Sequence, residues 1–128
     1  YAGWNTKFST PLPLPMQRDL INKYCDKFDI KINDYQFENE YCDWLPGLEK
    51  FITGLGIQGI VICSVYCLPD NKERRVELLN TAIDRGVELH FANELTVVKT
   101  KQDIEKLERI FEYINENTDP NITLGYTI

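Results

Sequence analysis

The segment Gly59–Val65 constrains the fold more than any other part of the chain. It reads Gly-Ile-Val-Ile-Cys-Ser-Val and is almost continuously apolar and β-branched. A strand with one solvated face alternates apolar and polar residues, whereas a strand covered on both faces is apolar throughout. The segment therefore predicts a buried strand in a parallel sheet and disfavours a β-sandwich.

Helix and strand patterns alternate along the rest of the 128 residues, with no linker or repeat between them. This order predicts a single three-layer α/β domain over residues 1–128, with a mostly parallel sheet of four or five strands and helices on both faces. Residues 122–128 fit either an edge strand or an ordered tail. The expected elements are strand 1–5, helix 16–27, strand 30–37, a helix opened by Pro46 whose apolar stripe includes Leu55, strand 59–65, a helix capped by Asp70 and ended by Gly86, strand 87–92, and a helix begun by Thr100 with Asp103.

The charge of the chain argues against a nucleic-acid partner. Fourteen Lys and Arg residues against twenty Asp and Glu residues give a net charge of −6, whereas binding to a phosphate backbone depends on basic side chains. No apolar run approaches the roughly 20 residues that span a bilayer. Tyr1–Trp4 lacks the basic and apolar segments of a signal peptide. We therefore expect a cytoplasmic protein without a membrane partner.

Cysteine and glycine patterns give no support for a metal or cofactor. The four cysteines, Cys25, Cys42, Cys63 and Cys67, do not have the spacing of a zinc site, and we interpret them as reduced thiols. The chain has no Gly-rich phosphate loop and no dinucleotide fingerprint. The expectation is a protein that works without a cofactor.

His90 is the only histidine, and it lies near the carboxyl end of a predicted strand with Glu94 just beyond it. A histidine beside a carboxylate suits general acid or base catalysis. Ser64, at the end of the buried strand, can supply a hydroxyl if it meets His90 across adjacent strand ends. If the two diverge, the enzymatic interpretation loses its support. The alternatives are a buried histidine bound to a backbone carbonyl and a serine that fills a tight strand end.

Further candidates follow from the rule that ligands of such sheets gather at the carboxyl ends of the strands. Arg75, near the start of a helix, can bind an anionic group through its guanidinium, although nearby glutamates make a solvated ion-pair face equally plausible. Glu40 lies in an acidic loop with aromatic neighbours that suits a sugar. Asn5 ends the predicted strand 1–5, and Tyr66 follows the predicted strand 59–65. These four side chains are the predicted substrate-binding residues.

The order of elements resembles the catalytic domain of serine recombinases, from a Tyr-led first strand through Gln17 in the first helix to Gly86-Val87-Glu88-Leu89. The resemblance implies a resolvase-like fold. The catalytic residues of that family are replaced: Gly3 and Asn5 stand where it has an arginine and the nucleophilic serine, and Tyr66-Cys67 stands where it has Asp-Arg.

The chain also resembles sporadic carbohydrate cluster proteins, a small bacterial family encoded among genes for surface polysaccharide synthesis. The most specific segment is Leu89-His90-Phe91-Ala92-Asn93-Glu94. It is accompanied by Pro15-Met16-Gln17, Tyr24-Cys25, Gly59-Ile60-Val61 and Leu68-Pro69. Two positions depart from the pattern: Tyr41-Cys42 replaces Asn-Cys, and Ala2 replaces an arginine.

The second resemblance implies a role in bacterial surface carbohydrate biosynthesis, with a sugar or sugar nucleotide as ligand. In the enzymatic version His90 is the acid or base, Glu94 orients it, Ser64 supplies a hydroxyl and Arg75 binds an anionic substituent. The reaction is left open among isomerisation, hydrolysis and group transfer. The alternatives are a noncatalytic partner of a glycan-modifying enzyme and a degenerate DNA-binding relative of the recombinases. Each of these functions is compatible with a homo-oligomer.

Overall fold

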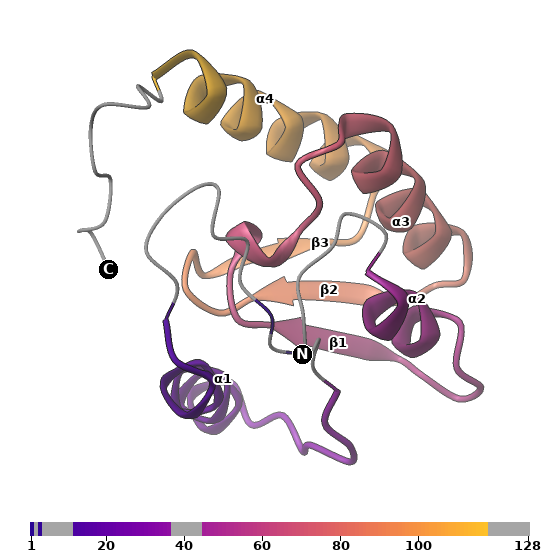
Figure 1. Ribbon diagram of the computed structural model, residues 1–128. Coiled ribbons are helices and arrows are strands. Elements are labelled where there is room, and N and C mark those ends of the chain that lie inside the picture. The colour runs from indigo at the N-terminus through magenta and orange to yellow at the C-terminus, as the bar shows by residue number, and fades with distance from the viewer. Residues whose placement is uncertain (2, 4–11, 37–44, 118–128) are drawn as a thin grey trace.

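The computed structural model describes Tyr1, Gly3 and residues 12–36 and 45–117. These residues form a mixed α/β structure around a three-stranded sheet (Figure 1). Its strands are β1 (Gly59–Ile62), β2 (Glu88–Phe91) and β3 (Thr96–Val98), in that order across the sheet. The helices are α1 (Leu14–Lys27), α2 (Pro46–Ile52), the 3₁₀ helix η1 (Val65–Cys67), α3 (Lys72–Asp84) and α4 (Lys101–Asn117).

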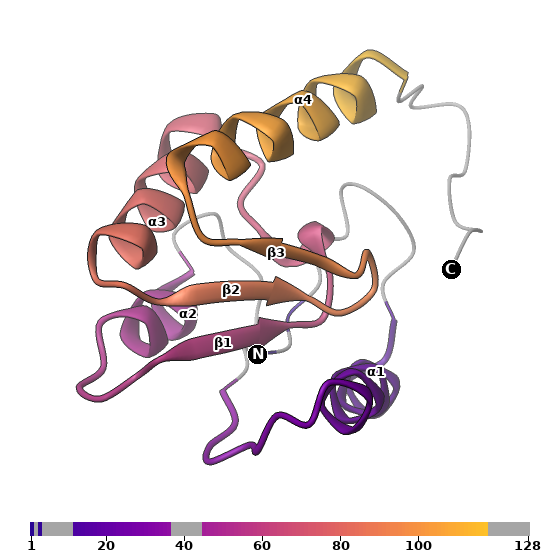
Figure 2. The ribbon, with the colours of Figure 1, turned by 180° about the vertical axis from the view of Figure 1, so that it is seen from behind.

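The sheet is mixed, whereas the sequence predicted a mostly parallel one. β1 and β2 are parallel, with Val61 opposite His90 and Ile62 opposite Phe91. β2 and β3 are antiparallel. α1 lies beside β1 and α4 beside β3, as both views of the ribbon show (Figures 1 and 2).

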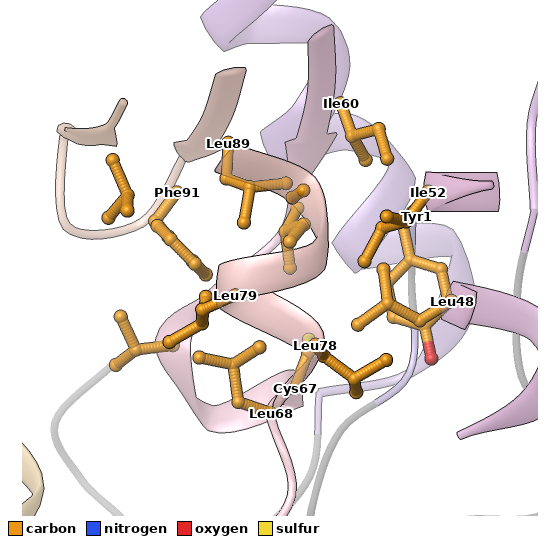
Figure 3. Close-up of a cluster of buried hydrophobic side chains, with 14 of the residues drawn as sticks. Tyr1, Leu48, Ile52, Ile60, Cys67, Leu68, Leu78, Leu79, Leu89 and Phe91 are labelled. Carbon is orange, nitrogen blue, oxygen red and sulfur yellow. The ribbon is translucent and has the colours of Figure 1, made fainter. Parts of the chain in front are cut away.

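Alternation along β1 and β2 divides their side chains between two environments. Ile60 and Ile62 of β1, with Leu89 and Phe91 of β2, are at most 2% exposed. They pack against apolar residues of α2 and α3, as the close-up of the core shows (Figure 3). Since successive residues of a strand point to opposite faces, His90 points away from this core. On that other face it meets α1.

The hydrogen bonds of Tyr1 agree with the start of the predicted strand 1–5. The backbone N–H of Cys63 donates to the carbonyl of Tyr1 at 3.1 Å. The amino nitrogen of Tyr1 donates to the carbonyl of Val61 at 2.6 Å. This is the bond pattern of a parallel ladder, with Tyr1 opposite Ile62. The remainder of the predicted strand 1–5 lies mostly outside the described residues, as do residues 118–128.

The predicted strand 30–37 is wrong over its described part. Residues 30–36 form no strand. Ile30 and Ile32 pack against the core while partly buried, and this contact accounts for the alternating pattern without any strand pairing. The sequence analysis predicted no strand at β3, because Thr96–Val98 is only three residues long.

The predicted helices are present, with differences at their ends. α3 is capped by Asn71, whose side chain accepts from the N–H of Arg74 at 2.9 Å, and not by Asp70. Leu55 lies beyond α2 and is 96% exposed. The cap of α4 is as predicted, because Thr100 and Asp103 accept each other's backbone N–H. Gly86 ends α3 with a φ of 72°.

The cysteines at 25, 63 and 67 are buried free thiols, while Cys42 lies outside the described residues. A hydrogen bond with Cys67, together with burial, raises the pKa of the Cys63 thiol far above its ordinary value. Burial also raises the pKa of Cys25. A thiol must ionise to act as a nucleophile, so neither group is suited to that role.

The assignment of core residues can be tested with two matched substitutions. Leu89 is 1% exposed and Leu55 is 96% exposed. Leu89→Ala is expected to lower the free energy of unfolding by about 2–5 kcal/mol, because it leaves a cavity in the core. Leu55→Ala should change it by less than about 0.5 kcal/mol. Urea denaturation of both variants measures the difference, and equal effects would contradict this placement of the core.

Candidate functional site

The predicted site residues fall into three separate clusters. Ser64 lies with Glu94 at the carboxyl end of β1, His90 lies on the sheet face toward α1, and Arg75 lies between α3 and α4. Asn5 and Glu40 lie outside the described residues. The predicted site residues that the structure describes therefore do not form one cluster.

Ser64 and Glu94 are joined directly. The Ser64 hydroxyl donates to Glu94 Oε2 at 2.6 Å, and the N–H of Val65 donates to Glu94 Oε1 at 3.0 Å. Asn93 Nδ2 also donates to Glu94 Oε2, at 2.9 Å. Glu94 therefore links the turn that follows β2 to the chain that leaves β1. Ser64 itself is fully buried.

Tyr66 belongs to the same cluster through its backbone. Its N–H donates to the Ser64 hydroxyl oxygen at 3.2 Å. This bond caps η1, and the Tyr66 side chain packs against the core while partly buried. Ser64 and Tyr66 thus shape the loop that follows β1.

His90 has different partners. The Tyr24 hydroxyl lies 2.8 Å from His90 Nδ1, and Glu88 Oε2 lies 3.1 Å from His90 Nε2. A neutral ring with its proton on Nε2 satisfies both contacts, because Nε2–H donates to the carboxylate and Nδ1 accepts from the phenol. This assignment requires Tyr24 to hold its proton. Burial raises the pKa of Tyr24, and Cys25 and Glu88 raise it further.

The predicted Ser64–His90–Glu94 arrangement is therefore corrected. The carboxylate that contacts His90 is Glu88, two residues earlier on the same face of β2, while Glu94 binds Ser64. Alternation along the strand places Glu88 beside His90. The enzymatic version that relied on Ser64 and His90 acting together is not supported by this geometry.

Arg75 is placed as a structural residue and not as an anion-binding one. Its guanidinium makes a bidentate ion pair with Glu108, with both N···O distances 2.6 Å, and donates to the carbonyls of Pro69 and Asp70. It also stacks on the Phe111 ring at 3.9 Å from the centroid. With only 3% of its side chain exposed, Arg75 connects α3 to α4 and to the loop before α3.

A cavity of about 730 Å³ is lined by Glu88 and His90 together with residues of the core-facing side, among them Ile60 and Phe51. We call it the His90 cavity. It runs toward the amino ends of β1 and β2, whereas the sequence prediction placed the ligand at their carboxyl ends. Its volume is within the roughly 300–1,000 Å³ of small-molecule sites. The polar side chains lining it include Lys31, Asn33, Asp34, Tyr35, Gln58, Glu88 and His90.

Sequence reasoning missed most of this lining. Asn33, Asp34 and Tyr35 lie in the segment that was predicted to be a strand. Glu88 had a usable signal, since a residue two positions from His90 on a strand shares its face. Tyr24 had none, because only the packing of α1 brings it to β2.

No family model, curated protein sequence or solved structure matches the chain. In the described part of the chain, no group of three or more His, Cys, Asp and Glu side chains is arranged to hold a metal. Within the same part, no helix has the length and apolar character needed to cross a membrane.

The structural role of Arg75 predicts a large effect on stability. Arg75→Met leaves the nearly buried Glu108 carboxylate unpaired and should cost about 3–5 kcal/mol of unfolding free energy. Lys101→Met is the matched control, because it removes an exposed ion pair with Asp84 that is worth at most about 1 kcal/mol. Urea denaturation distinguishes the two. An Arg75 variant as stable as the control would show that the guanidinium serves something other than packing.

The environment of Tyr24 predicts a loss of stability in alkali. Its pKa is raised in the folded protein, so above an ordinary tyrosine pKa of about 10 the unfolded chain loses the proton first. The free energy of unfolding therefore falls as the pH rises from about 10. Tyr24→Phe should reduce this fall, whereas Tyr113→Phe, at an exposed position, should not. Denaturation curves at several alkaline pH values test the prediction, which fails if both variants retain the wild-type slope.

Proposed function

We propose that this protein acts in bacterial surface carbohydrate biosynthesis and binds a sugar or an activated sugar in the His90 cavity. The resemblance to sporadic carbohydrate cluster proteins suggests the biological setting. The single observation that carries the binding site is the Glu88–His90 pair in the wall of a cavity of suitable size.

The lining of the cavity supports a carbohydrate ligand. Glu88, Asp34 and Asn33 offer oxygen acceptors for sugar hydroxyls, while Asn33 and Gln58 offer amide donors. Tyr35 and Phe51 add aromatic surface against which the apolar face of a sugar ring can pack. A few polar groups set among apolar ones are typical of small-molecule sites.

For an enzymatic role, the proposal makes His90 the acid or base and replaces Glu94 with Glu88 as the carboxylate that orients it. A carboxylate bound to one ring nitrogen fixes the tautomer of the imidazole. The proposal assigns no reaction among isomerisation, hydrolysis and group transfer.

The second candidate is a noncatalytic partner of a glycan-modifying enzyme. The observation in its favour is the separation of Ser64 from His90, since the serine is buried and bound to Glu94. A protein of this kind would bind the same ligand without changing it.

We also propose a resolvase-like sheet with a first strand beside β1, and a cytoplasmic protein that binds no nucleic acid and no membrane. The two ladder bonds of Tyr1 support the additional strand. The net charge of −6 supports the absence of a nucleic-acid partner.

Mass spectrometry of bound and converted carbohydrates tests the proposed function. The protein is incubated with a mixture of free sugars and nucleotide sugars, and the retained fraction and the free fraction are both analysed. We expect a retained carbohydrate with the wild type, and roughly 5- to 150-fold weaker binding with His90→Gln, on the basis of about 1–3 kcal/mol for a lost polar contact.

Glu73→Gln is the control, because Glu73 is exposed on α3 and lies outside the lining of the cavity. It should retain the carbohydrate as the wild type does. Conversion of a sugar by the wild type alone would assign an enzyme, and retention without conversion would favour the noncatalytic partner. If no carbohydrate is retained or converted, the proposed function is wrong.

A further inference from the structure

On the basis of the proposed function, we infer that the His90 cavity takes the uncharged ring of a sugar and binds no phosphate or carboxylate group. This narrows the ligand from a sugar or activated sugar to a sugar recognised through its hydroxyls. It also reverses an expectation from the sequence, which assigned Arg75 to an anionic substituent.

The charges that line the cavity argue against an anion. Asp34 and Glu88 are acidic, and Lys31 is the basic side chain among the described lining residues apart from His90. Lys31 is exposed, so its charge is screened by water and salt. Sites that bind phosphate usually present arginine forks, several lysines or a helix amino end. Among the residues that the structure describes, the lining provides no arginine.

The two arginines near the start of α3 are engaged elsewhere. Arg75 is paired with Glu108, and Arg74 is paired with Glu49 and Glu77 at 3.1 Å and 2.6 Å. Both side chains are at least 96% buried. If one of these guanidinium groups moved away to bind a ligand, its carboxylate partner would be left without a counter-charge, which is strongly unfavourable.

The acceptor groups of the cavity match sugar hydroxyls instead. Glu88 Oε2 accepts a hydrogen bond from His90 Nε2, and Glu88 Oε1 lies 3.8 Å from Lys99 Nζ. A carboxylate has about four acceptor positions, so Glu88, which is 45% exposed, has the capacity to accept from hydroxyl groups as well. The histidine holds the carboxylate in place, and Glu88 belongs to the lining of the cavity.

Tyr35 gives the cavity a fixed aromatic wall. Its hydroxyl donates to Asn22 Oδ1 at 2.6 Å, and the Arg18 guanidinium lies 4.9 Å from its ring centroid. Both partners belong to α1, so the loop that carries Tyr35 is tied to that helix. A ring held in this way needs little ordering when a flat ligand packs against it, and such preorganisation favours binding.

Saturation-transfer NMR with three sets of probes tests the inference. The first set contains methyl glycosides of neutral hexoses, 6-deoxyhexoses and N-acetylhexosamines. The second contains the UDP and GDP derivatives of the same sugars, and the third contains UDP and GDP alone. We expect signals from one or more of the methyl glycosides and none from the third set.

The variants locate the binding. Glu88→Gln should weaken binding of the glycoside by about tenfold, because a hydrogen bond to a charged acceptor is lost. Glu73→Gln should leave it unchanged. Raising the salt to about 0.5 M should change the affinity less than twofold, since an uncharged ligand is not screened.

The outcomes separate the inference from the proposed function. Binding of UDP or GDP, or binding of a sugar only when the diphosphate is attached, would overturn the inference and leave carbohydrate binding intact. Glycoside binding that Glu88→Gln does not weaken would also overturn it, since the ligand would lie elsewhere. Binding by none of the three sets would overturn both.

Discussion

The parallel register of β1 and β2 is the constraint on which the rest of the structure depends. With Val61 opposite His90 and Ile62 opposite Phe91, alternation sends Leu89 and Phe91 into the core and sends Glu88 and His90 to the face that meets α1. A shift of one residue would exchange the two sets. Such a shift would bury a carboxylate and an imidazole and expose two large apolar side chains. The packing of the apolar core therefore fixes the register, and the register places Glu88 and His90 in the lining of the His90 cavity.

The strongest elements of the fold were predictable because their patterns are local. The apolar run of β1, the stop at Gly86, and the Thr100–Asp103 cap each act within a few residues. β3 and the irregular segment 30–36 were not predictable in this way. Pairing across the sheet decides whether a short or alternating segment becomes a strand, and neighbouring residues do not encode that pairing.

The candidate site was predictable in part. His90 was identified from the sequence as a candidate acid or base on a strand, and it lines the cavity. Its carboxylate partner was not identified correctly, because Glu94 was chosen for its place just beyond the predicted strand end, whereas the pleat of the strand places Glu88 beside His90. The role of Arg75 depended on Glu108, which is distant in sequence and meets it only when α4 packs against α3.

The two polar clusters have distinct physical roles in this account. Ser64 and Glu94 tie together the chain segments that leave β1 and β2, at the carboxyl end of the sheet. Tyr24, His90 and Glu88 tie α1 to the sheet and present a carboxylate to the cavity. The first cluster is satisfied within the protein, and the second retains capacity for a ligand.

Mapping of backbone amide shifts by NMR tests this division most directly. A mixture of neutral sugars is titrated into the isotope-labelled protein, and the shifted amides are assigned. The account predicts changes around Asn33, Gln58, Glu88 and His90, with Ser64, Val65 and Glu94 unaffected. Changes confined to Ser64, Val65 and Glu94 would contradict it, because the ligand site would then lie at the carboxyl ends of the strands.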